Sequence, residues 1–60
     1  MNDPTTNYML EILAVDVAEH RRRFGNQDFA IGWWVVKWSS TPFGQAAWDA
    51  VDIAKKAGLV

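Results

Sequence analysis

The side chain with the widest chemical repertoire in this 60-residue chain is its one histidine, His20. Asp16 lies one helical turn before it, so on a helix the imidazole and the carboxylate would share a face. A metal site between packed helices needs a Glu-x-x-His motif, but position 17 holds valine. Two ligands are too few to hold a metal ion. We therefore expect no metal site, and we assign His20 to a partly buried or helix-end position.

Catalysis needs several reactive groups that converge on one place, and the sequence offers no such set. Ser39, Ser40 and Thr41 have no base nearby and are typical of a turn that leads into a helix. The chain contains no cysteine, which excludes a disulfide framework, a thiolate metal site and a redox motif. We expect a protein that is not an enzyme and that binds no cofactor.

Two basic groups, Arg21–Arg23 and Lys55–Lys56, each come shortly before a glycine. Positive charge at the carboxyl end of a helix compensates the helix dipole, which explains both groups without a ligand. Residues 51–60 also resemble the opening helix and turn of the LacI-type repressor headpiece, without that family's recognition helix. The resemblance does not carry that family's function over. The alternative function, a DNA-binding transcriptional regulator, depends on the two basic groups themselves. Asp49 and Asp52 argue against it, because they occupy the expected reading face of the last helix and would repel phosphates.

Tryptophan is the most unusual feature of the composition, with four residues among 60: Trp33, Trp34, Trp38 and Trp48. Each indole brings about 200 Å² of mostly apolar surface, and a domain of this size buries only about 60% of its unfolded surface. Trp33 and Trp34 are adjacent, so they point in different directions in a helix or a strand. We expect at least two of the four to serve a partner or a self-association surface.

Local signals predict a first helix over residues 4–24. Asp3 is a suitable N-cap, Pro4 is favourable in the first turn, and Gly25 can end the helix. The helix carries one apolar stripe with Met9, Leu10, Leu13, Val17 and Phe24, and a second one roughly opposite with Tyr8, Ile12 and Val15. A helix that is buried on one side needs only one stripe, so the second stripe predicts another contact.

The segment 29–38 is apolar on both faces whether it is a helix or a strand, so periodicity does not decide between them. We favour a helix over 28–39, because a single strand would have no partner for its backbone groups within the chain. The alternative is an α-β-α chain in which 29–38 forms a strand that pairs between two chains of a homodimer. A capping cluster at Ser39–Pro42 and a stop signal at Gly58 predict a last helix over 42–57.

These elements predict a mostly α fold, a single small domain over residues 1–60 built from three helices. The stripes of the helices define its expected core, formed by Met9, Leu13, Val17, Phe24, Trp33, Val36, Phe43, Ala47, Ala50 and Ala54. The remaining apolar side chains define an expected docking surface, formed by Tyr8, Ile12, Val15, Trp34, Trp38 and Trp48.

The predicted function is that of a small non-catalytic protein–protein interaction module. It could be an accessory subunit, an adaptor or a stoichiometric inhibitor of a larger protein. The expected partner is another protein or a second copy of the chain, with a homodimer as the expected form. The chain has 6 basic and 7 acidic residues, so nucleic acid is not expected as a partner. A membrane surface, contacted through the Trp-rich stretch and Lys37, is an alternative.

The sequence predicts a cytoplasmic location. The polar segment Met1–Asn7 contains no basic residue and does not resemble a secretory signal. The longest apolar run, Phe29–Val36, is far shorter than the roughly 20 residues that span a bilayer.

Overall fold

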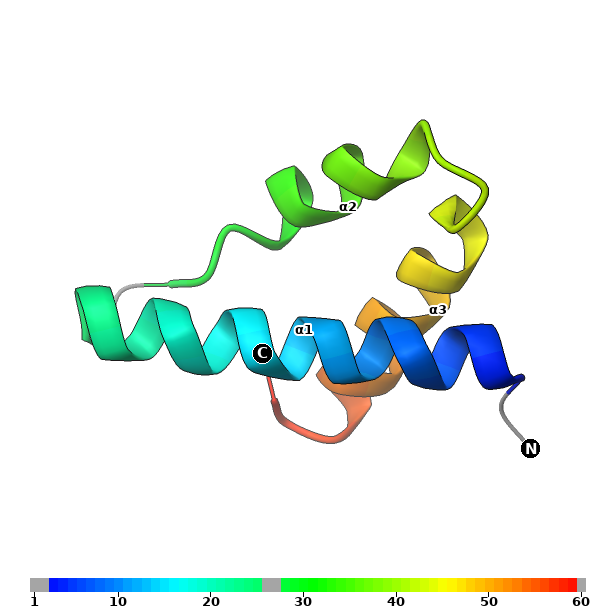
Figure 1. The fold of residues 1–60 in the computed structure, drawn as a ribbon. Coiled ribbons are helices and arrows are strands. Elements are labelled where there is room, and N and C mark those ends of the chain that lie inside the picture. Colours follow the sequence, from blue (N-terminus) through cyan, green and yellow to red (C-terminus); the bar gives the residue numbers. More distant parts are fainter. Residues whose placement is uncertain (1–2, 26–27, 60) are drawn as a thin grey trace.

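The computed structural model describes residues 3–25 and 28–59, which form three helices: α1 (Pro4–Phe24), α2 (Ile31–Ser39) and α3 (Gly44–Lys56) (Figure 1). The predicted mostly α class is confirmed, with all three expected helices present. Met1, Asn2, the middle of the turn expected at 25–27, and Val60 lie outside the described residues.

Helix α1 has the boundaries that its local signals predict. The Asp3 side chain accepts a hydrogen bond from the backbone N–H of Thr5 at 3.0 Å, and Pro4 occupies the first helical position. At the other end Gly25 takes a positive φ of 66°, and its N–H donates to the carbonyl of Arg21 at 2.8 Å. Only a residue without a Cβ adopts this conformation readily, so Gly25 fixes the end of α1.

Helix α2 resolves the ambiguity of the apolar middle segment. The alternative with a strand over 29–38 is wrong, because Ile31–Ser39 is helical. In a helix the segment satisfies its own backbone hydrogen bonds, whereas a strand would need a second chain. The helix begins at Ile31 rather than at Asp28, and its N-cap, Ala30, offers no side-chain hydrogen bond.

Helix α3 is slightly shorter than the predicted range 42–57. The Thr41 hydroxyl accepts a hydrogen bond from the Phe43 N–H at 3.1 Å, so this residue organises the turn before the helix rather than its first turn. After the helix Gly58 has a φ of 78°. The N–H of Leu59 then donates to the carbonyl of Ala54 at 2.9 Å, which closes the end of the helix.

Helix α3 is the central element of the packing. It contacts both α1 and α2, whereas in the described ranges the backbones of α1 and α2 do not pack directly against each other. Figure 1 shows α2 held away from α1, whereas α3 starts close to the end of α2 and crosses α1 near its middle. The Cα atoms extend over 31 × 24 × 15 Å. Two packed helices span about 13–15 Å between their outer Cα atoms, so the molecule is about two helices thick in its shortest dimension, and much of each helix lies at the surface.

The core is correspondingly small. Its buried apolar residues are Met9, Leu13, Val17, Trp34, Val35, Ala46, Ala47, Ala50, Val51 and Ala54. Alanine on α3 lets the neighbouring helices approach closely but fills little volume. Of the predicted core, the structure confirms Met9, Leu13, Val17, Ala47, Ala50 and Ala54.

The other predicted core residues are exposed, namely Phe24, Trp33, Val36 and Phe43, and that part of the prediction is wrong. On α2, Trp33 and Val36 are exposed because they share a face with Lys37, which follows Trp33 by one helical turn. An ammonium group is rarely buried without a partner, so this face stays in water. The opposite face, with Trp34 and Val35, packs inward instead. The two adjacent indoles therefore have the opposite of their predicted roles.

Candidate functional site

Trp34, which we expected on the docking surface, is a core residue. Its side chain is 5% exposed, and its indole Nε1 donates a hydrogen bond to Oδ2 of Asp16 at 2.7 Å. This hydrogen bond joins α2 to α1, whose backbones do not pack directly against each other. The expectation that Trp34 is available to a partner is wrong.

The sequence held a signal for this contact. A buried indole N–H needs an acceptor, and Asp16 lies at the edge of the α1 stripe that contains Met9 and Leu13. A carboxylate in that position can reach a side chain that packs on the stripe. The sequence-based prediction treats Asp16 only as a possible companion of His20 and so misses its structural role.

Trp38 and Ile12 also belong to the edge of the core rather than to a free surface. Both are partly buried and pack against the core cluster. The Trp38 ring lies 6.3 Å from that of Trp34 and makes an edge-on contact with Phe43 at 6.2 Å between ring centroids. Its Nε1 is buried and has no hydrogen-bond partner.

The remaining predicted docking residues are exposed. Tyr8 and Val15 lie on the outer face of α1, opposite the buried stripe, and Trp48 lies on the outer side of α3. Of the six predicted residues, only these three are exposed, because Trp34 is buried and Ile12 and Trp38 are partly buried against the core.

The most exposed indole of the described chain belongs to Trp33, at 77%. Val36, at 59%, and Lys37 follow it by three and four residues, so all three lie on one face of α2. We call this set, Trp33, Val36 and Lys37, the α2 surface. The Lys37 Nζ lies 5.7 Å from the centre of the Trp38 ring, and no described carboxylate forms an ion pair with it.

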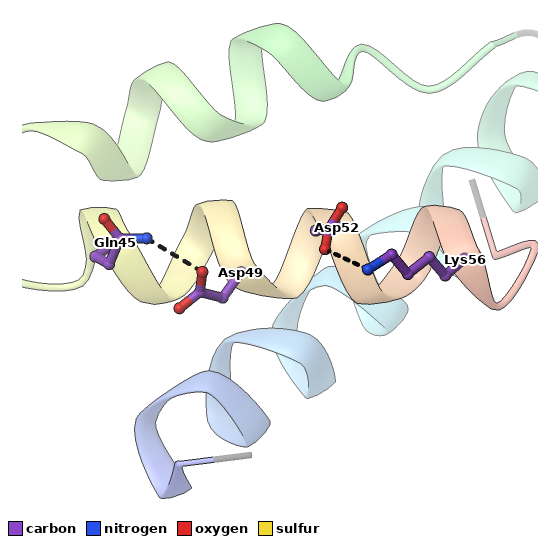
Figure 2. Close-up of polar contacts among 4 residues, drawn as sticks. All are labelled: Gln45, Asp49, Asp52 and Lys56. Atoms are coloured by element: carbon purple, nitrogen blue, oxygen red, sulfur yellow. Dashed lines mark hydrogen bonds and ion pairs between the residues drawn. The ribbon is translucent and has the colours of Figure 1, made fainter. Parts of the chain in front are cut away.

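A second exposed indole lies on α3 among acidic groups. Trp48 is 57% exposed, and we call Trp48, Asp49 and Asp52 the α3 surface. Figure 2 shows that the two carboxylates have different partners along the helix. Asp52 forms an ion pair with Lys56 at 3.1 Å, whereas Asp49 accepts only a hydrogen bond from the Gln45 amide at 3.1 Å. Because that amide is neutral, the charge of Asp49 stays uncompensated.

The His20 ring contacts two phenylalanine rings. Its ring centroid is 5.0 Å from that of Phe24 and 5.4 Å from that of Phe29, the second contact being T-shaped. Its Nδ1 is buried without a hydrogen-bond partner. In residues 3–25 and 28–59 no three His, Asp or Glu side chains gather closely enough to hold a metal ion. The observed contacts give His20 a packing role between α1 and the segment before α2.

Three of the five basic side chains in the two groups make contacts within the chain. Arg21 Nη2 donates to the carbonyl of Leu59 at 3.2 Å, which fastens the turn after α3 to the end of α1. Arg23 pairs with Glu19 at 2.9 Å, and Lys56 pairs with Asp52. DNA binding stays a prediction, but each of these contacts competes with a phosphate for a cation.

No known protein family, curated protein or solved structure matches this chain. Across the described part of the chain, each helix is too short or too polar to cross a membrane.

Proposed function

We propose that this chain is a non-catalytic protein–protein interaction module that docks through the α2 surface. The observation that carries the proposal is the exposure of Trp33, at 77%. A largely solvated indole beside a solvated valine is unfavourable in a monomer, because both leave apolar area in contact with water.

The α2 surface has the composition of an interface centre. Tryptophan is enriched among the residues that contribute most to binding, and such residues fill pockets in the partner. Trp33 and Val36 would supply the apolar anchor. Lys37, at the edge of the same face, would select a partner with a carboxylate beside its apolar pocket.

The rest of the fold supports this use of α2. The helix is held to α1 by the bond between Trp34 and Asp16, and it packs on α3. The α2 surface is therefore presented on an element whose other face is fixed. A rigid anchor loses little conformational entropy on binding, which favours affinity.

Tyr8 and Val15 on α1 remain a proposed second contact region, as the two-stripe pattern of that helix suggests. An accessory subunit, an adaptor and a stoichiometric inhibitor would each use a small rigid domain of this kind. All three roles require that the chain binds a protein and does not itself catalyse a reaction.

The proposal can be tested by site-specific photocrosslinking in the cells that make the protein. A photoreactive phenylalanine analogue at position 36 would leave Trp33 in place and lie within one turn of it. We expect a covalent product heavier than the chain itself, and we expect Trp33→Ala to abolish it. The mass of the product distinguishes a second copy of the chain from another protein.

Position 14 provides the matched control, because Ala14 is exposed on α1 outside both the α2 and α3 surfaces and lies about 100° or more around the helix from Tyr8 and Val15. The same analogue there should give no product that depends on Trp33. Equal products from both positions, or no product from position 36, would contradict docking through α2.

A further inference from the structure

We propose that the partner of the α2 surface is a second copy of this chain, which it contacts through that copy's α3 surface. This inference rests on the proposed function and names the occupant of its site. Each copy would then contribute one α2 surface and one α3 surface, and two equivalent contacts would form. Such a reciprocal arrangement closes after two copies, as expected for a symmetric dimer.

Charge complementarity is the first argument. Lys37 and Asp49 carry opposite charges, and neither has an ion-pair partner among the described residues. Each lies next to an exposed indole, Lys37 one turn after Trp33 and Asp49 directly after Trp48. Docking of α2 on α3 would bring these charges together twice in each dimer.

The position of the two surfaces is the second argument. Helices α2 and α3 pack against each other, and Figure 2 shows them running side by side in opposite directions. The two surfaces therefore belong to a pair of neighbouring helices. A two-fold axis would place α2 of each copy opposite α3 of the other.

Exposed area is the third argument. With up to about 250 Å² for an indole side chain, the exposed parts of Trp33 and Trp48 amount to roughly 300 Å² in each copy. The two copies together would thus bury about 600 Å² of indole surface. This is about half of the ~1,200 Å² that a small stable interface requires, before Val36 and the charged residues are counted.

Sedimentation equilibrium with charge-reversed variants tests the arrangement. Lys37→Glu would place two acidic groups opposite each other at both contacts, and Asp49→Lys would place two basic groups there. We expect each variant alone to dimerise roughly tenfold more weakly than the unmodified chain, since exposed pairs contribute about 1 kcal/mol or less each.

An equimolar mixture of the two variants should restore the affinity. At one contact the carboxylate introduced at position 37 of one copy then faces the ammonium group introduced at position 49 of the other. At the second contact the native pair of Lys37 and Asp49 forms. Recovery in the mixture therefore depends on the two positions facing each other across the dimer.

Ala14→Lys is the matched control, since Ala14 is exposed on α1 outside both surfaces and lies about 100° or more around the helix from Tyr8 and Val15. It should leave the dimer affinity within about twofold of the unmodified chain. Circular dichroism of each variant checks that the helices persist.

A chain that stays monomeric at millimolar concentration would overturn the inference, and so would a mixture that fails to regain the affinity. If the crosslinker at position 36 still gave a Trp33-dependent product with another protein, the proposed function would stand and only the second copy would be wrong. If neither association nor crosslinking occurred, both proposals would fail.

Discussion

At the scale of single residues, the hydrogen bond from Trp34 to Asp16 is a side-chain contact that joins α2 to α1. It measures 2.7 Å and joins helices whose backbones do not pack together. We predict that Asp16→Ala lowers the free energy of unfolding by about 1.5–3 kcal/mol, because it leaves the buried indole N–H without an acceptor. Asp16→Asn keeps an acceptor oxygen and should cost less than about 1 kcal/mol. Urea denaturation measures both, and equal losses would contradict the assigned role.

His20, unlike Trp34, has a buried polar atom without a hydrogen-bond partner, its Nδ1. We predict that His20→Phe keeps the ring contacts with Phe24 and Phe29 and does not destabilise the fold. A gain of up to about 1 kcal/mol is expected, since an unsatisfied polar atom is removed from the interior. Thermal denaturation provides the measurement. A clear loss of stability would mean that the imidazole makes a polar contact that the packing does not explain.

At the scale of elements, Gly32 at the start of α2 has room for a side chain, whereas Gly44 at the start of α3 does not. A Cβ on Gly32 would meet no atom within 4 Å, whereas a Cβ on Gly44 would lie 3.1 Å from the backbone oxygen of Ser39. We predict that Gly32→Ala stabilises the protein by about 0.5–1 kcal/mol through helix propensity. Gly44→Ala should destabilise it, because the end of α2 would have to move away from α3. Paired denaturation curves test this, and the same sign for both substitutions would contradict the observed helix junction.

The helices differ in how far the sequence alone predicts them. Capping by Asp3 and termination at Gly25 are local events, so both ends of α1 could be placed correctly. The start of α2 could not, because Ala30 carries no capping side chain and packing determines where the helix begins. The position of Lys37 indicates that its own face of α2 is exposed and that the opposite face packs inward. Because both faces are otherwise apolar, the hydrophobic pattern alone does not distinguish them.

At the scale of the whole molecule, the thin packing explains why the predicted docking residues separate. Three helices arranged with α3 in the middle leave the outer faces of α1, α2 and α3 in water, and each carries an exposed aromatic residue. Helix periodicity identifies such faces one by one. Their relative positions depend on helix packing, which the sequence pattern does not specify.

DNA binding is also a question for the whole molecule, because it requires free cations on one face. Arg21, Arg23 and Lys56 are bonded within the chain, and Asp49 and Asp52 are exposed on α3. We predict no measurable affinity for duplex DNA at low ionic strength, where phosphate contacts are strongest. A titration of labelled duplex with increasing salt tests this prediction. Binding that weakens steeply with salt would restore the regulator as a candidate.

The most direct test compares the two adjacent indoles by sedimentation equilibrium, with unfolding curves measured beside it. Trp33→Ala should weaken self-association about 30-fold or more, since a central indole contributes about 2 kcal/mol or more, and should leave the unfolding free energy of the monomer unchanged. Trp34→Phe should lower that free energy and leave the association of the folded chain intact. An unchanged association of Trp33→Ala, or a loss of association confined to Trp34→Phe, would contradict self-association through the outer face of α2.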